Sequence, residues 1–288
     1  MIQQPIKLYE TDAAPAATMR AYNNAIAKEA ILIIGPLPRT SLSLLAQRKL
    51  LAVPTVALNI VDDEKTPTNL YQFGLPITHE ARIVARAAKE KGYTEAIVLK
   101  GNGSLDMRSA DAFTKEWASL NNTIKSELPI KDIAAVQKLL AAPAGQHTMV
   151  FVAADFQTAL PILKSTPSTW AMFGTSSLNT NSPAIATLDK NLKIYFVDVP
   201  TLLSAQPGTE KMPAPVNNPI NFRLYSLGMD AYRLAALLLR DEVKFNRTVV
   251  DGATGKLSIT RNGNVERELP LMLLREANLR NTASLDHK

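Results

Sequence analysis

The stretch AIVLKGNGSLDMRSADAFTKEWASLNNTIKSEL, residues 96–128, contains one complete strand–helix–strand unit. Residues 96–100 are an apolar run of strand length, and residues 105–120 repeat apolar side chains at the three- and four-residue spacing of a helix. A second strand-type run follows at residues 124–128. Two strands joined by a crossover helix lie parallel in one sheet, so this stretch predicts an α/β protein.

The same alternation of strand-type and helix-type segments continues along most of the 288 residues. Further strands are predicted at residues 6–9, 31–35, 55–59, 71–74, 149–154, 170–174, 194–199 and 269–274, and further helices at residues 13–29, 41–50, 78–91, 132–140, 156–163, 183–189 and 221–239. Residues 257–265 predict a β-hairpin that turns at Asn262 and Gly263, because both residue types tolerate positive φ. Proline-rich residues 203–219 predict a loop. The chain as a whole predicts parallel sheets flanked by helices.

The composition is that of a globular protein, with 46% hydrophobic and 20% charged residues. No apolar run approaches the roughly 20 residues that a membrane-spanning helix needs. The chain has no cysteine, which excludes disulfides, thiolate metal sites and cysteine nucleophiles. The net charge is +6, but no run of Lys and Arg indicates a nucleic-acid surface. Residues 1–9 lack the pattern of a signal peptide, so we expect that none exists or that it was removed.

Two motifs carry a resemblance to a known family. Residues 222–232, FRLYSLGMDAY, and residues 251–258, DGATGKLS, resemble the C-terminal domain of LppC- or LpoA-type outer-membrane lipoproteins. Residues 33–37, IIGPL, and residues 73–85 fit the same family. The resemblance covers nearly the whole chain and implies a two-lobed, type I periplasmic-binding-protein-like fold.

In such a fold the chain crosses between the lobes three times, and the expected crossings are residues 73–78, 197–201 and 251–255. They place lobe one at 1–77 and 200–250, lobe two at 78–199 and 251–280, and a tail at 281–288. Lobe one seems incomplete on this comparison, because residues 6–9 match what is normally the second strand. The usual first strand and helix are then missing.

Members of this family are periplasmic, are anchored to the outer membrane by a lipid, and activate a class A penicillin-binding protein that synthesises peptidoglycan. The resemblance therefore implies a non-catalytic periplasmic regulator. Its only link to the membrane would be a lipid anchor, for which this chain has no cysteine. The alternative that the fold leaves open is a periplasmic receptor for an amino acid or a similar small polar solute.

Six residues are candidates for holding a small polar ligand between the lobes: Thr40, Ser41, Asn102, Ser104, Tyr225 and Asp230. The first four follow predicted strands and open predicted helices, where free backbone N–H groups favour a ligand carboxylate. The last two lie near the start of the long helix, where a carboxylate could pair with a ligand amine. The alternatives are helix capping, an ordinary turn and a structural carboxylate, respectively.

No catalytic, cofactor or metal site is predicted. The histidines His79, His147 and His287 lack metal-binding spacing. No serine lies in a G-x-S-x-G motif or beside a plausible base. The glycines at 101–103 and 252–255 do not complete a dinucleotide fingerprint or a phosphate-binding loop. We therefore expect a protein that is not an enzyme.

Overall fold

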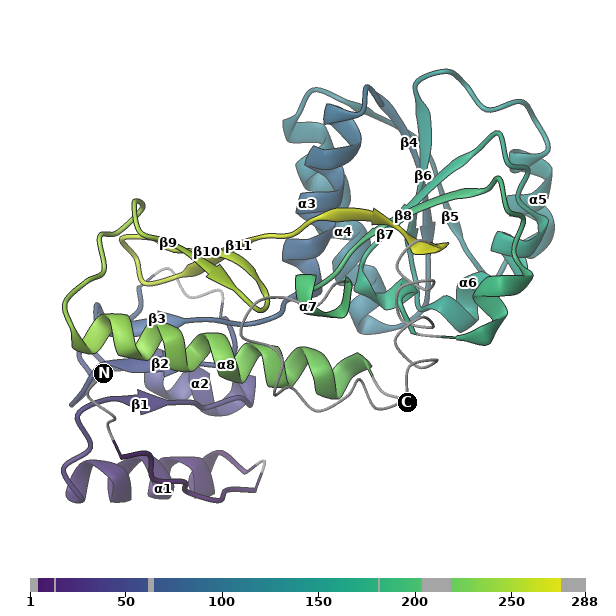
Figure 1. Cartoon of the computed structure of the whole chain (residues 1–288). Coiled ribbons are helices and arrows are strands. Elements are labelled where there is room, and N and C mark those ends of the chain that lie inside the picture. Colours follow the sequence, from purple (N-terminus) through teal and green to yellow (C-terminus); the bar gives the residue numbers. More distant parts are fainter. Residues whose placement is uncertain (1–4, 13, 62–64, 181, 204–218, 276–288) are drawn as a thin grey trace, which may run out of the picture. The chain divides into compact units, whose positions relative to one another are not determined.

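A computed structural model describes residues 5–12, 14–61, 65–180, 182–203 and 219–275 (Figure 1). The chain forms two compact units. Unit 1 consists of residues 1–75, 227–252 and 256–267, and unit 2 of residues 76–226, 253–255 and 268–288.

Unit 2 is built on a six-stranded sheet with the strand order β12-β8-β7-β6-β4-β5 (Figure 1). Its strands are β4 (Glu95–Lys100), β5 (Thr123–Pro129), β6 (Thr148–Ala153), β7 (Ala171–Gly174), β8 (Lys193–Val197) and β12 (Leu271–Leu273). The first five pair in parallel, and β12 pairs antiparallel with β8 at one edge. The predicted parallel α/β sheet is thus confirmed, with an antiparallel strand added.

Helices cover both faces of this sheet. They are α3 (Ile77–Glu90), α4 (Ser104–Ser119), α5 (Ile133–Leu140) and α6 (Phe156–Ser165), with the short helices η1 (Ser176–Leu178), η2 (Pro183–Thr187) and α7 (Pro200–Leu203). Val98 and Phe151 share a core cluster with α3 and α4, whereas their neighbours Leu99 and Val152 share one with α5 and α6. Successive strand residues point to opposite faces, and both faces are buried, which explains why these strands read as continuous apolar runs.

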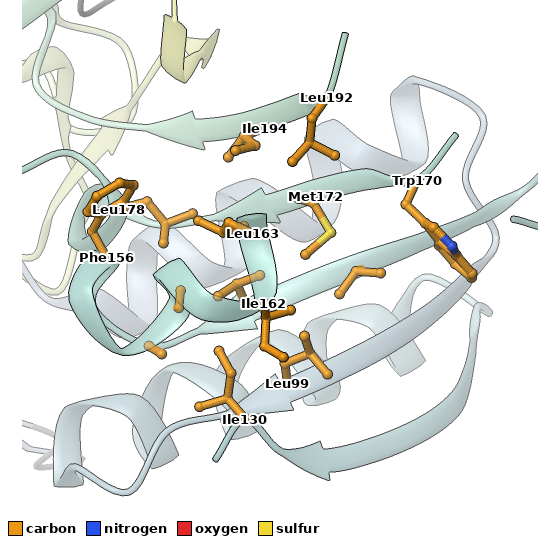
Figure 2. Close-up of a cluster of buried hydrophobic side chains, with 14 of the residues drawn as sticks. Leu99, Ile130, Phe156, Ile162, Leu163, Trp170, Met172, Leu178, Leu192 and Ile194 are labelled. Atoms are coloured by element: carbon orange, nitrogen blue, oxygen red, sulfur yellow. The ribbon is translucent and has the colours of Figure 1, made fainter. Parts of the chain in front are cut away.

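The core on the α5 and α6 side is shown in Figure 2. Leu99 and Met172 come from the sheet, and Phe156 and Ile162 come from α6. Trp170 closes one end of this cluster, and its indole N–H donates to the Leu140 carbonyl at 2.8 Å. The one polar atom of this large side chain is therefore satisfied inside the core.

Unit 1 contains two smaller sheets and three helical segments. A parallel sheet runs in the order β1 (Ile33–Ile34), β2 (Thr55–Ala57), β3 (Leu70–Gln72), and a second sheet in the order β11 (Val265–Glu268), β10 (Gly255–Ile259), β9 (Val249–Gly252). The helices are α1 (Pro15–Ala27), α2 (Arg39–Ala46) and the greater part of α8 (Pro219–Leu239). Val56 of β2, Leu234 of α8 and Leu257 of β10 pack in one buried cluster.

The predicted hairpin is present, with a different turn geometry. Gly263 has φ +82°, whereas Asn262 does not take positive φ. The Gly263 N–H donates to the Thr260 carbonyl at 3.0 Å, and the Gln72 N–H donates to the Gly263 carbonyl at 2.9 Å. A Cβ at position 263 would collide with the Leu70 carbonyl oxygen. Glycine is therefore required here both by backbone conformation and by close approach to β3.

Several expectations differ from the structure. Residues 6–9 form no strand, since no described strand pairs with them, and a strand needs a hydrogen-bonded neighbour. Ile6 and Leu8 are 69% and 87% exposed. The expected boundaries placed residues 200–250 with the first lobe, whereas the chain stays in unit 2 as far as Ser226. The tail at 281–288 and most of the predicted loop lie outside the described residues.

The hairpin also differs in its unit. Residues 251–280 were expected in the second lobe, but residues 256–267 belong to unit 1. The reason is packing, because Leu257, Ile259 and Val265 share the buried cluster of Val56 and α8.

Candidate functional site

Two of the predicted ligand residues, Thr40 and Ser41, lie in the first turn of α2. The N-cap of this helix is Pro38, and no side chain caps it. Thr40 is exposed. Ser41 is fully buried, and its hydroxyl donates to Thr18 Oγ1 of α1 at 3.1 Å. Ser41 thus joins two helices inside unit 1, and only Thr40 faces solvent.

Asn102 and Ser104 lie in the exposed connection between β4 and α4. The backbone N–H of Gly103, the N-cap of α4, donates to Asp106 Oδ2 at 3.0 Å. The same carboxylate also lies close over Gly101, where a Cβ would collide with it. A negative charge of the chain itself therefore occupies the helix start that could otherwise attract an anionic ligand.

Tyr225 and Asp230 both lie on α8. Tyr225 is 43% exposed. Asp230 is fully buried, and its Oδ1 accepts a hydrogen bond from Arg233 Nη1 at 2.8 Å. The alternative of a structural carboxylate describes Asp230 better than a role toward solvent.

The six predicted residues belong to different units. Thr40, Ser41 and Asp230 are in unit 1, and Asn102, Ser104 and Tyr225 are in unit 2. As a ligand-binding set they stay a prediction.

The most highly connected polar cluster of unit 2 surrounds Arg223, in the second turn of α8. Its Nε donates to Asp198 Oδ1 at 2.8 Å, and its Nη2 donates to Asp198 Oδ2 at 2.6 Å. Nη2 also donates to the carbonyls of Ser176 at 3.0 Å and Asn179 at 3.1 Å. One guanidinium group is thus held by two carboxylate oxygens and two backbone carbonyls.

The carboxylate of Asp198 is fixed by further contacts. Its side chain is fully buried, whereas that of Arg223 is 14% exposed. Asp198 Oδ1 accepts the Val199 N–H at 2.8 Å, and Oδ2 accepts Asn179 Nδ2 at 2.9 Å. Buried charges are tolerated when they are paired and hydrogen-bonded in this way.

A second carboxylate, that of Glu80 at the start of α3, lies beside this cluster. Glu80 is 5% exposed, and its Oε2 accepts the Ser176 N–H at 2.9 Å. Burial alone would lower the pKa of the Arg223 guanidinium. The hydrogen bonds and the charge of Asp198, together with the charge of Glu80, raise this pKa above its ordinary value. Arg223 is therefore a permanent cation in an anionic site.

A hydroxyl pair next to the cluster fixes the start of α8 in unit 2. The hydroxyls of Thr201 and Ser226 lie 2.9 Å apart, and Thr201 also donates to the Ala253 carbonyl at 3.0 Å. Ser226 donates to the Phe222 carbonyl within the helix at 3.0 Å. Phe222 packs with Val199 in a small buried cluster.

The residues of this cluster were not among the sequence-based candidates. A partial signal was available, because Ser176, Asn179 and Asp198 follow the ends of predicted strands, where α/β proteins place their binding groups. Arg223 lies in the FRLYSLGMDAY motif, but its contact with Asp198 spans 25 residues and has no local pattern.

Two searches of the described residues found no candidates. No group of three or more His, Cys, Asp or Glu side chains there is placed to hold a metal ion. No helix within the described ranges is long and apolar enough to cross a membrane.

Comparison with known families gives one match over almost the whole chain. The family model described as "LppC putative lipoprotein" matches residues 2–142 and 134–275. A relative from Haemophilus ducreyi, named "Penicillin-binding protein activator LpoA", is 28% identical over 257 residues, which are 83% of this chain and 42% of that protein. The chain spans about half the length of the curated relatives that it matches, or less.

Two solved structures show the same fold. One is titled "Structure of a putative branched-chain amino acid ABC transporter from Chromobacterium violaceum ATCC 12472"; it is 30% identical, with a TM-score of 0.75, and the match covers 92% of this chain and 86% of that one. The other is "LpoA (YraM) C-domain from Haemophilus influenzae, a regulator of PBP1A", at 20% identity and TM-score 0.72, covering 88% and 83%.

Proposed function

Because the chain belongs to the LppC lipoprotein family, we propose that it is a non-catalytic regulator that activates a class A penicillin-binding protein in peptidoglycan synthesis. The family match over residues 2–142 and 134–275 carries this proposal. The names of the relatives support it, since they are called penicillin-binding protein activators. One structural neighbour is titled a regulator of PBP1A.

The proposed location is the periplasm, with the full-length protein anchored to the outer membrane by a lipid. The description of the family as lipoproteins supports a place in the cell envelope. The chain itself has no cysteine that could carry the lipid.

A regulator needs a surface for its partner, and we place the contact on α8. Of the seven tyrosines in the sequence, only Tyr225 and Tyr232 are exposed, and both lie on this helix. They are 43% and 44% exposed and seven residues apart, so they lie on one face. Leu224 adds an exposed apolar side chain. Tyrosine is enriched where protein interfaces gain most of their binding energy.

The test is a glycan-polymerisation assay with the cognate class A penicillin-binding protein. The protein should raise the polymerisation rate, and the double variant Tyr225→Ala/Tyr232→Ala should need about tenfold more protein for half of the effect. The control is Leu105→Ala, which changes an exposed apolar side chain on α4. Full activity of the tyrosine variant would move the contact elsewhere, and no stimulation by the unaltered protein would refute the proposed function.

A solute receptor is the second candidate, because the neighbour with 30% identity is titled a branched-chain amino acid ABC transporter component. Two helix-start and strand-end sites of unit 2 argue against it, since Asp106 and Arg223 of the chain itself fill them. Calorimetry with leucine and other amino acids decides the case. Tight binding of one of them, without an effect on the synthase, would favour the receptor.

A further inference from the structure

The strand ends of β7 and β8 in unit 2 carry a set of acceptors that matches one chemical group. Asp198 follows β8 directly, and Ser176 and Asn179 follow β7. Two carboxylate oxygens and two carbonyls converge on the Arg223 guanidinium, at distances between 2.6 and 3.1 Å. A planar fork of N–H donors fits such a set, whereas a spherical ammonium does not.

These acceptors are held in place without help from the arginine. The Asp198 carboxylate accepts hydrogen bonds from Val199 and Asn179, and the Ser176 N–H is bonded to Glu80. Asp198, Asn179 and Glu80 are 1%, 2% and 5% exposed. The site is therefore organised by buried groups of residues 80–199, and Arg223 enters it from the later helix α8.

The location is also that of a binding site. Ligands of α/β proteins bind beyond the carboxyl ends of parallel strands, which is where Asp198, Ser176 and Asn179 lie. Two carboxylates, Asp198 and Glu80, face a single guanidinium, so the site has an excess of negative charge with Arg223 in place and a larger one without it.

We propose that this cluster is a guanidinium-binding site whose ligand is built into the chain: Arg223 occupies it in place of a free guanidinium or amidinium compound. With the arginine side chain removed, the site would bind such a cation from solution. The inference does not rest on the proposed regulatory function, because its test uses the isolated protein and no synthase.

The experiment is chemical rescue of Arg223→Ala. Thermal unfolding is followed with about 20 mM methylguanidinium chloride, with methylammonium chloride at the same concentration as the control for a cation without the fork. The melting temperature of Arg223→Ala should rise by roughly 3–6 °C with methylguanidinium and by less than about 1 °C with methylammonium. The unaltered protein and Arg223→Ala/Asp198→Asn should respond to neither.

A matched control removes an arginine from the surface. Arg86 pairs with Glu116 at 2.7 Å, but its side chain is 58% exposed. Arg86→Ala should therefore show no rescue. Equal responses of Arg86→Ala and Arg223→Ala to methylguanidinium, or no response of Arg223→Ala, would overturn the proposal.

If Arg223→Ala fails to fold, Arg223→Lys tests the same point. Lysine keeps the charge but cannot bond both Asp198 oxygens and the two carbonyls in one plane. The melting temperature of Arg223→Lys should fall clearly below that of the unaltered protein. Unchanged stability would mean that the site needs only a positive charge, and the guanidinium assignment would be wrong.

Discussion

The strand ends of unit 2 use aspartate in two different ways. After β4 and β6, the exposed residues Asp106 and Asp155 cap the next helix, and both bond to backbone N–H groups within three residues of themselves. After β8, the buried Asp198 is completed by Arg223, 25 residues later in the chain. Water can replace an exposed cap, but it cannot replace the partner of a buried charge. The cost of losing each aspartate should therefore follow its burial more than its number of hydrogen bonds.

Asp198→Asn should have the largest effect. The Arg223 guanidinium would remain largely buried without its carboxylate, which typically costs about 3–5 kcal/mol of unfolding free energy. Urea unfolding measures the loss. Glu116→Gln is the control, because it breaks the exposed pair with Arg86 and should change stability by about 0.5 kcal/mol or less. Equal losses in the two variants would remove the distinction between the buried and exposed sites.

Asp106→Ala should have a smaller effect, of about 1 kcal/mol, because it removes the carboxylate that accepts the Gly103 N–H at the start of α4. Asp111→Ala, an exposed aspartate later in the same helix, is the control and should be nearly neutral. A loss in Asp106→Ala as large as that in Asp198→Asn would contradict the comparison.

Asp155 should show the smallest effect and a dependence on pH. Burial raises the pKa of its carboxyl, but hydrogen bonds from Thr158 and Gln157 outweigh burial and lower it below the ordinary value. A lowered pKa in the folded state stabilises the protein above the unfolded pKa, near 4, and this contribution is lost as the pH falls through the folded value. The stability difference between the unaltered protein and Asp155→Ala should therefore be largest near pH 7 and shrink in acid.

A difference that stays constant between pH 7 and pH 2 would show that the charge of Asp155 does not contribute. Urea midpoints of the two proteins, measured side by side at each pH, provide the test.

The fold of unit 2 could be predicted because its signals are local. Short apolar strands alternate with helices, and Gly92, at φ +91°, lies just past the end of α3 as expected. The strand predicted at residues 6–9 was wrong, because an apolar alternation forms a strand only beside a neighbour that can share its hydrogen bonds. The hairpin could be predicted from Asn262 and Gly263, but its place in unit 1 depends on packing against α8.

The polar cluster could be predicted only in part. Strand ends are visible in the sequence, and they include Ser176 and Asp198. The contact with Arg223 joins residues that are distant in the chain, and no spacing rule links them. Ser41 illustrates the opposite error, because a polar residue at a helix start looks available for a ligand, yet its hydroxyl is bonded to Thr18 inside unit 1.

The central claim, that this chain regulates a synthase and does not transport a solute, is tested most directly by one titration. The rate of glycan polymerisation by the cognate class A penicillin-binding protein is measured as the protein is added, with and without leucine at about 1 mM. We predict a saturable rise of several-fold in the rate, unchanged by leucine. A rate that stays flat at every protein concentration, or a rise that appears only with leucine, would contradict the account.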